Sequence, residues 1–188
     1  MISILLSICI GIGLSAATGF RVFIPMLIAN IATMTGIIHP SESFSWLGTW
    51  PAFWVLATAS VCEIVAYYIP FFDNILDTIM TPLTFVAGAL LMTSFVYIQN
   101  PALHWALGII LGGGTAGAIQ AGTSVTRLAS SVTTAGIGNP LISTIENILS
   151  IIISIISIIL PILALITVLF LCWFIVRILG KKTKPDSI

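Results

Sequence analysis

The stretch LISTIENILSIIISIISIILPILALITVLFLCWFIVRIL, residues 141–179, decides the fold class of this chain. It is almost wholly apolar, and as one straight α-helix it would be roughly 58 Å long, about twice the length of a perpendicular membrane crossing. The stretch must therefore tilt, kink at Pro161 or fold back there. The proline is the only turn signal near its middle, so these three interpretations stay open.

The composition of the whole chain is typical of a membrane protein. Hydrophobic residues make up 59% of the 188 residues, charged residues make up only 6%, and the mean hydropathy is +1.20. Because a soluble domain carries about 25% charged residues, this chain is predicted to lie in a lipid bilayer. Its formal net charge is +0. We expect no nucleic-acid partner, since there is no basic excess to attract one.

Long apolar segments continue through the rest of the chain. They favour helices, which satisfy their own backbone hydrogen bonds in lipid, over an outer-membrane barrel, whose strands alternate in polarity. We predict an all-α, polytopic transmembrane fold with about five to seven membrane segments, some of them short or interrupted. The apolar segments are Ile2–Ala17, Phe20–Ile38, Trp50–Ile69, Pro82–Ile98, Ala102–Gln120 and Leu141–Leu179.

Residues 1–180 are predicted to form a single transmembrane domain, followed by a basic tail at 181–188. No Lys or Arg precedes the first apolar segment, so we expect a retained helix there rather than a cleaved signal peptide. Four of the six basic residues lie near the C-terminus, and the positive-inside rule places that tail in the cytoplasm. They are Arg177, Lys181, Lys182 and Lys184.

Six further charged residues lie within or beside apolar segments. A charge at the centre of a membrane helix costs at least about 2.5 kcal/mol, so such residues pair, face a cavity or carry function. Two arginines against four carboxylates leave two negative charges in excess. If both arginines pair, two acids need a proton, a cation or water, and hydration in an interfacial loop is the alternative for Asp73 and Asp77. The six are Arg21, Glu63, Asp73, Asp77, Arg127 and Glu146.

These charges lead to two expectations. Arg21 and Arg127 should each contact one of the four acids, because a guanidinium does not remain bare at membrane depth. At least one remaining carboxylate should take up a proton near physiological pH or hold a cation. Glu63 and Glu146 are the candidates for that role.

Polar residues form a stripe on one face of the segment that carries Glu146. Ser143, Glu146, Ser150, Ser154 and Ser157 recur at three- and four-residue steps, the spacing of one helical face. The stripe either lines a hydrated path ending at Glu146 or supplies hydrogen bonds between packed helices. A run of glycines, Gly112 to Gly114, leaves a similar choice between a helix interruption and close packing of backbones.

Two stretches of the chain resemble each other. PFFDNILD at 70–77 and NPLISTIENILS at 139–150 share an acid-Asn-Ile-Leu core after a proline, and an arginine that follows small residues lies upstream of each. A true repeat, with halves 1–98 and 102–180, would indicate an inverted-repeat transporter whose solute site lies near the membrane midplane. Chance similarity in a chain rich in Ile and Leu is the alternative.

A set of positions spread over most of the chain also resembles a known family. They are Gly13, Arg21, Pro25, Glu63, Pro70, Asp73, Asp77, Arg127, Asn139, Pro140, Ser143 and Glu146. On these residues the chain is similar to small bacterial membrane proteins grouped as domain of unknown function 4126. It departs from them at Tyr67-Tyr68, where the resemblance implies an Asp-Lys pair. The resemblance implies an integral protein of the bacterial inner (cytoplasmic) membrane, leaves homo-oligomerisation open, and implies no established activity.

Motifs of hydrolases, zinc proteases and nucleotide-binding enzymes do not occur in the sequence. We therefore expect no enzyme activity, no cofactor and no metal. The first functional hypothesis is a small transporter or channel for an ion or small polar solute. The alternative is a non-transporting accessory or lipid-interacting scaffold, whose dry, paired charges only fix helix packing. The predicted pathway residues are Arg21, Glu63, Asp73, Asp77, Arg127, Asn139, Ser143 and Glu146.

Overall fold

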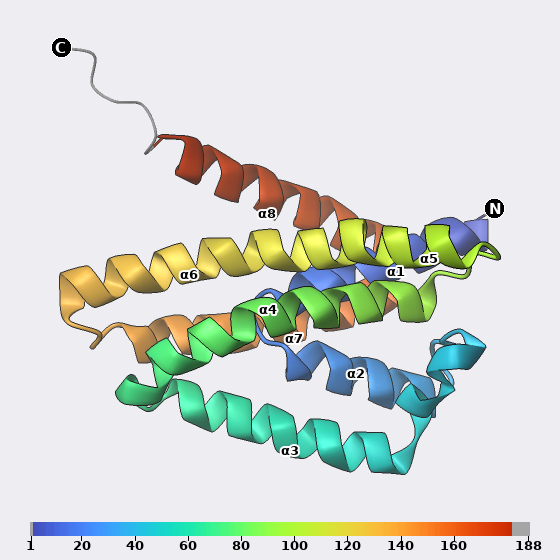
Figure 1. Ribbon diagram of the computed structural model, residues 1–188, viewed down its shortest axis with the longest axis horizontal. Helices are drawn as coiled ribbons and strands as arrows, with labels where there is room; N and C mark the ends of the chain where they lie inside the picture. The colour runs from blue at the N-terminus through green and yellow to red at the C-terminus, as the bar shows by residue number, and fades with distance from the viewer. Residues whose placement is uncertain (1, 182–188) are drawn as a thin grey trace.

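The computed structural model describes residues 2–181, without the side chains at 2–3, 70–74, 176 and 178–181. Helices make up nearly all of this range and no strand occurs in it, which confirms the predicted all-α class (Figure 1). The predicted tail lies outside the described residues beyond Lys181. The elements are α1 (Ile2–Thr18), α2 (Phe23–Met34), the 3-10 helix η1 (Glu42–Gly48), α3 (Trp50–Tyr67), α4 (Pro70–Phe95), α5 (Pro101–Leu107), the π-helical η2 (Gly108–Gly113), α6 (Gly114–Thr134), α7 (Asn139–Ile159) and α8 (Pro161–Lys181).

The described helices include four candidate membrane spans and three shorter apolar helices. Four helical stretches are long and apolar enough to cross a bilayer, and three shorter ones are also apolar. Two predicted segments, 82–98 and 102–120, overlap helices that begin or end more than ten residues beyond the predicted bounds. The long ones are Trp50–Tyr67, Ile75–Phe95, Pro101–Thr134 and Asn139–Ile159, and the shorter ones are Ile4–Thr18, Phe23–Met34 and Pro161–Ile175.

Prolines and polar caps set where many of these helices begin. A proline occupies the first or second position of α3, α4, α5 and α7, where its fixed φ suits the helix and its missing N–H costs no hydrogen bond. Thr49 caps α3 by accepting from the Ala52 amide. Asn100 caps α5 by accepting from the amides of Ala102 and Leu103. Proline thus marks the start of α3, α4, α5 and α7, and a side-chain cap from Thr49 or Asn100 is added at α3 and α5.

The long C-terminal apolar stretch folds back at Pro161. Leu160 leaves the helical conformation with φ −131° and ψ 67°, and α8 starts at the next residue. α8 then runs in the opposite direction to α7 and packs against it and α1 (Figure 1). The fold-back alternative is therefore the observed one, and it needs only a single non-helical residue.

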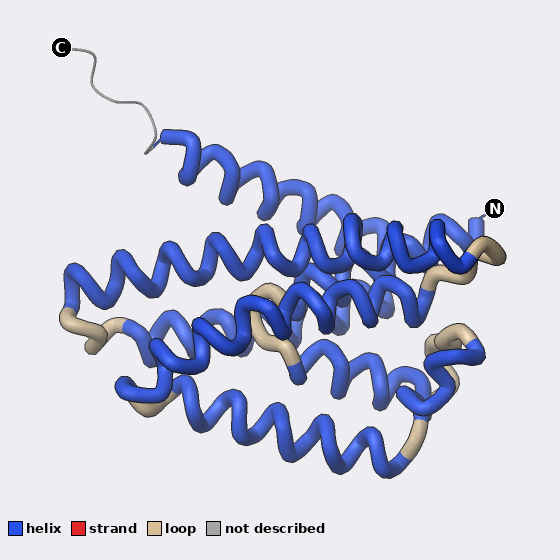
Figure 2. The backbone as a smooth tube through the Cα atoms, in the orientation of Figure 1, coloured by secondary structure: helices blue, strands red, loops and turns tan. Residues whose placement is uncertain are grey.

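α1 and α2 form a hairpin that ends half-way through the bundle. Its turn, residues 19–22, lies near the middle of the molecule, and both helices extend from it toward the same end (Figure 2). At 1.5 Å per residue α2 is about 18 Å long, well short of a hydrocarbon core of about 30 Å. The hairpin thus brings a helix break to the middle of the bundle.

Small residues bring the central helices together. α1 contacts α4, α7 and α8, and its Leu14, Ala16 and Ala17 are fully buried. Where α4 crosses η2, a Cβ added to Gly88 would lie 2.7 Å from the carbonyl oxygen of Gly112, and a Cβ on Gly112 would collide with Gly88. Gly112 therefore serves close packing, one of the two sequence interpretations. The π-helical η2, which includes Gly112 and Gly113, is also a local departure from the α-helix, as the other interpretation proposed.

Candidate functional site

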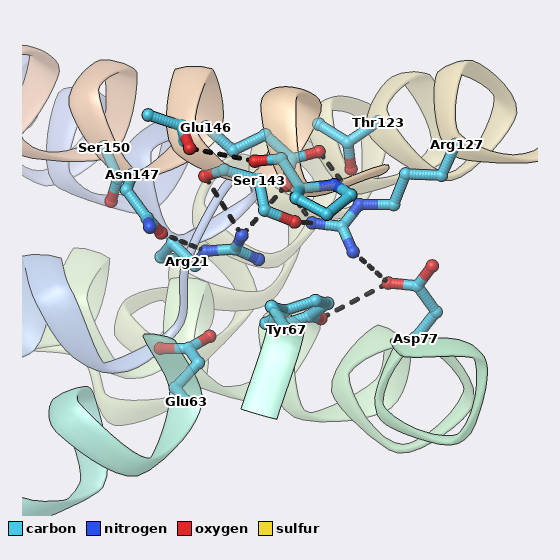
Figure 3. Close-up of polar contacts among 12 residues, drawn as sticks. Arg21, Glu63, Tyr67, Asp77, Thr123, Arg127, Ser143, Glu146, Asn147 and Ser150 are labelled. Carbon is cyan, nitrogen blue, oxygen red and sulfur yellow. Dashed lines mark hydrogen bonds and ion pairs between the residues drawn. The ribbon is translucent and has the colours of Figure 1, made fainter. Parts of the chain in front are cut away.

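Arg21, in the turn of the α1–α2 hairpin, is 1% exposed and reaches toward α7. Its Nε donates to Asn147 Oδ1 at 2.5 Å, and its Nη2 donates to the Ser143 carbonyl oxygen at 3.3 Å. The same Nη2 lies 3.2 Å from Glu146 Oε2 (Figure 3). The hairpin turn is thus joined to one face of α7 by charge-assisted contacts.

Arg127 approaches the same glutamate from α6. Its Nε donates to Glu146 Oε1 at 3.1 Å, and its Nη2 contacts Glu146 Oε2 and donates to Ser143 Oγ at 3.4 Å. Its Nη1 lies 3.5 Å from Asp77 Oδ1 on α4. Arg127 is 4% and Glu146 3% exposed. The predicted pairing is confirmed, because both arginines contact an acid, and they share Glu146.

Tyr67, near the end of α3, lies against both guanidinium groups. The Cζ atoms of Arg21 and Arg127 are 3.8 and 4.2 Å from its ring centroid, and its hydroxyl donates to Asp77 Oδ1 at 3.3 Å. The negative face of the ring attracts both cations and offsets part of their mutual repulsion. Sequence reasoning did not assign Tyr67 to the site, although it follows Glu63 by one helical turn and so shares its face.

Glu63 is buried to the same degree as Glu146 but has different partners. Its Oε1 accepts from the Val22 amide at 2.9 Å and its Oε2 from the Phe23 amide at 3.0 Å. These amides begin α2, where the helix dipole and free N–H groups favour a negative charge. A carboxylate from α3 therefore caps the inner end of the hairpin's second helix.

The structure narrows the interpretations of two acids. Glu146, one of the two candidates for a carboxylate that takes up a proton or holds a cation, contacts both arginines. Asp77 is not a purely hydrated loop residue, since its side chain is 21% exposed and contacts Arg127 and Tyr67. The side chain of Asp73 lies outside the described residues. Glu63 carries one of the negative charges that exceed the number of arginines, and two backbone amides stabilise its carboxylate.

The family model for domain of unknown function 4126 (DUF4126) matches residues 8–181, which include every residue of this centre. The chain belongs to the DUF4126 family. The resemblance predicted from the sequence is thereby confirmed at the level of the family. Among curated proteins and among solved structures, none matches the chain.

The serine stripe of this DUF4126 chain packs against α1. Ser150, Ser154 and Ser157 are fully buried, and Ser150 Oγ donates to the carbonyl oxygen of Ala17 at 3.2 Å. The other two donate to carbonyl oxygens of their own helix at 2.6 Å. A Cβ added to Gly13 would collide with Ser157. These contacts match the packing alternative for the stripe beyond Glu146.

Asn139 lies away from the two arginines in the DUF4126 fold. It is the first residue of α7, about 10 Å along the helix axis before Glu146, and its Nδ2 donates to Ser131 Oγ at 3.0 Å. Ser143 lies about one turn before Glu146 and contacts both arginines. Its carbonyl oxygen accepts from Arg21, and its Oγ accepts from Arg127. Of the predicted pathway residues on α7, Ser143 and Glu146 therefore lie together against the two arginines, while Asn139 begins the helix beside Ser131.

A cavity of about 250 Å³ adjoins the charged centre between α6, α7 and α8. Glu146 contributes to its wall together with apolar side chains such as Phe20, Leu149 and Phe174. The cavity therefore suits an apolar group better than a hydrated solute. Within the described part of the chain, no three side chains of His, Cys, Asp or Glu come together as metal ligands.

The two arginines of the DUF4126 chain occupy different local structures. Arg21 lies in a turn between helices, whereas Arg127 lies inside the continuous helix α6. Asp73 is the fourth residue of α4, and Glu146 is the eighth of α7. The matched motifs thus fall at different points of their helices, and the internal repeat is not supported.

Proposed function

We propose that this protein transports an ion or small polar solute across a membrane and that the centre around Arg21, Arg127 and Glu146 carries this activity. The observation behind the proposal is the α1–α2 hairpin, whose turn holds Arg21 at mid-depth against α7. Interrupted helices that meet near the midplane are a recurring way to form solute sites in transporters, because their free backbone ends bind charge.

The energetic cost of the centre supports a role beyond packing. Buried ion pairs are often replaced by apolar side chains with no loss of stability, or with a gain. Here five ionisable groups from five segments converge, and four of them are less than 5% exposed: Arg21, Glu63, Arg127 and Glu146, with Asp77 as the fifth. A chain that needed only to hold helices together would be served by apolar contacts. Transport gives these charges a use.

The shared carboxylate suggests how such a centre changes state. Two guanidinium groups on different elements depend on one glutamate, so a solute that competes for either cation also loosens the hairpin turn from α6 and α7. The observed arrangement, with its charges buried and paired, is then the closed state of the cycle. This mechanism needs no inverted repeat, since one interrupted hairpin supplies the site.

The membrane orientation follows as part of the proposal. The basic C-terminus puts the end of α8 in the cytoplasm of a bacterial cell by the positive-inside rule. The hairpin, which opens toward the end of the bundle away from the end of α8 (Figure 1), then enters from the outer side.

One observation favours the scaffold alternative. The charges are buried and paired, and the cavity beside Glu146 has an apolar wall. A protein that binds lipid or a partner helix, with its charges only setting helix register, would have these features. Flux measurements separate the two functions.

The test is reconstitution into liposomes with ion-selective readouts for protons, alkali cations and small anions. We expect flux of one of these above that of empty liposomes, and loss of that flux in Glu146→Gln protein that still elutes as a single folded species. Glu42→Gln, which neutralises an exposed glutamate in η1, is the matched control and should transport normally. Wild-type protein without flux, or Glu146→Gln protein with full flux, would contradict the proposal.

A further inference from the structure

We infer that the cavity between α6, α7 and α8 binds one acyl chain of an anionic phospholipid, whose head group lies beside Arg177 on α8. The inference goes beyond the proposed transport function and does not depend on it. It rests on the lining of the cavity, on its opening and on the charge beside that opening.

The lining of the cavity favours an alkyl chain over a polar ligand. Apolar side chains from all three helices form most of the wall. The hydroxyls of Thr123 and Thr126, which also line it, donate to carbonyl oxygens of their own helix. The carboxylate of Glu146 is already bound by Arg21 and Arg127. The wall therefore offers a polar ligand no side-chain donor.

The size of the cavity suits part of a single acyl chain. Apolar cavities exclude water and take up apolar molecules, and one of about 150 Å³ holds the six carbon atoms of benzene. The cavity beside Glu146 measures about 250 Å³. By the same proportion it has room for roughly ten carbon atoms.

The cavity opens on the outer surface of the bundle. Ile145 and Phe174, in its wall, are 50% and 47% exposed. α8 diverges from α6 toward its C-terminal end (Figure 1). Because a bilayer surrounds a bundle of apolar helices with acyl chains rather than water, a chain of a neighbouring lipid can enter sideways between α6 and α8.

Arg177 marks where the head group lies. It is exposed and follows Phe174 by three residues, so it lies on the same face of α8, about 4.5 Å further along the axis. Its Cζ is 5.1 Å from the ring centroid of the exposed Trp173. Tryptophan and basic side chains at the end of a membrane helix are typical of the head-group level. A lipid with its phosphate at Arg177 therefore has its chains beside the cavity.

The charge at this end of the bundle complements an anionic head group. Lys181, Lys182 and Lys184 follow Arg177 in the sequence. Residues 128–145, which include the last turns of α6 and the first turns of α7 at the same end (Figure 1), contain no Asp or Glu. Asp77, on α4, contacts Arg127. Basic side chains beside a gap between membrane helices attract anionic lipids.

The first test measures the thermal midpoint in detergent with added lipid. Dioleoyl phosphatidylglycerol should raise the midpoint of wild type by about 3 to 6 °C at ten times Kd. Dioleoyl phosphatidylcholine, which has the same chains and no net charge, should give a smaller rise at the same concentration. Inorganic phosphate at equal ionic strength should give none, because it has no acyl chain. Equal rises with the two lipids, or a rise with phosphate, would overturn the inference.

Thr126→Trp tests the cavity, because the indole takes the place of the chain. This variant should lose the response to phosphatidylglycerol. Leu128→Trp, at an exposed position of the same helix outside the cavity wall, should keep it. Ile145→Trp fills the cavity from α7 and gives the same test if Thr126→Trp does not fold. A full response of both cavity variants would contradict the site, as would a lipid-free dimer that Thr126→Trp converts into a monomer, since a second copy would then fill the cavity.

Arg177→Gln tests the head group. It should weaken phosphatidylglycerol binding about fivefold and leave phosphatidylcholine binding unchanged, whereas Arg177→Lys should keep the preference for the anionic lipid. Unchanged preference after replacement of Arg177 and the three lysines by Gln would contradict the head-group site. None of these readouts measures flux, so a negative result here leaves the proposed function standing, and absence of flux leaves the lipid site standing.

Discussion

Glu146 and Glu63 are both 3% exposed, yet two different kinds of partner stabilise them. Glu146 contacts the guanidinium groups of Arg21 and Arg127, whereas Glu63 accepts from the backbone amides of Val22 and Phe23. Side-chain cations compensate the first charge, and the end of a helix compensates the second. The difference teaches that in this bundle a buried acid is not evidence of a buried cation beside it.

The largest effect should come from Glu146→Gln. This change leaves two buried guanidinium groups without their shared counter-ion, and breaking a buried ion pair costs about 3–5 kcal/mol. Thermal or denaturant unfolding in detergent should rank it as the least stable of the variants described here. The control Glu42→Gln should match wild type. A Glu146→Gln protein as stable as wild type would mean that the arginines find other acceptors.

Glu63→Gln should cost less than Glu146→Gln, about 1–3 kcal/mol, because its partners are neutral amides and the Gln carbonyl oxygen still accepts from one of them. The same unfolding experiment measures the difference. If Glu63→Gln proves the more damaging change, the helix terminus contributes more than the arginine pair, and the comparison between the two acids has the wrong order.

Tyr67→Phe should have a smaller effect, about 0.5–1.5 kcal/mol, since it removes only the hydroxyl that donates to Asp77. The ring under the two guanidinium groups remains. Tyr67→Leu removes the ring as well and should therefore be less stable than Tyr67→Phe by about 0.5–2 kcal/mol. Equal stability of the Phe and Leu variants would show that the ring does not stabilise the arginines.

The smallest effect is expected for Ser154→Ala. Its hydroxyl donates to the Ser150 carbonyl oxygen of its own helix, so the loss should be about 0.6 kcal/mol or less, and flux in liposomes should not change. A marked loss of flux with intact folding would return the serine stripe to its other interpretation, a hydrated path that leads to Glu146.

The pairing of charges was predictable from the sequence, while their geometry was not. The cost of a bare arginine at membrane depth is a general property, so contacts of Arg21 and Arg127 with acids followed from composition and position alone. The partners of Glu63 could not be predicted in this way. Every residue except proline has a backbone N–H, and only the position of the hairpin turn, set by how α1 and α2 pack, makes two of these donors available to Glu63.

The fold shows the same limit. Apolar length and Pro161 predicted helices and a change of direction, but a kink and a fold-back differ by the conformation of the single residue Leu160, which its sequence context does not determine. The internal repeat was suggested by four-residue motifs, and such short motifs can recur by chance in a chain rich in Ile and Leu. Tyr67 was overlooked because an aromatic residue at the end of an apolar segment usually marks the membrane interface.

The central claim is that this centre moves an ion across the membrane. Its most direct test is to measure the internal pH of liposomes that contain the protein and a trapped pH-sensitive dye. When inward gradients of protons, alkali cations and small anions are imposed in turn, at least one of them should change the interior pH faster with wild-type protein than in empty liposomes, and Glu146→Gln should abolish the difference. Glu42→Gln should behave as wild type. An interior pH that follows the empty-liposome trace for wild-type protein, with chloride and with every other small ion tried, would contradict the account and leave the charges as packing elements.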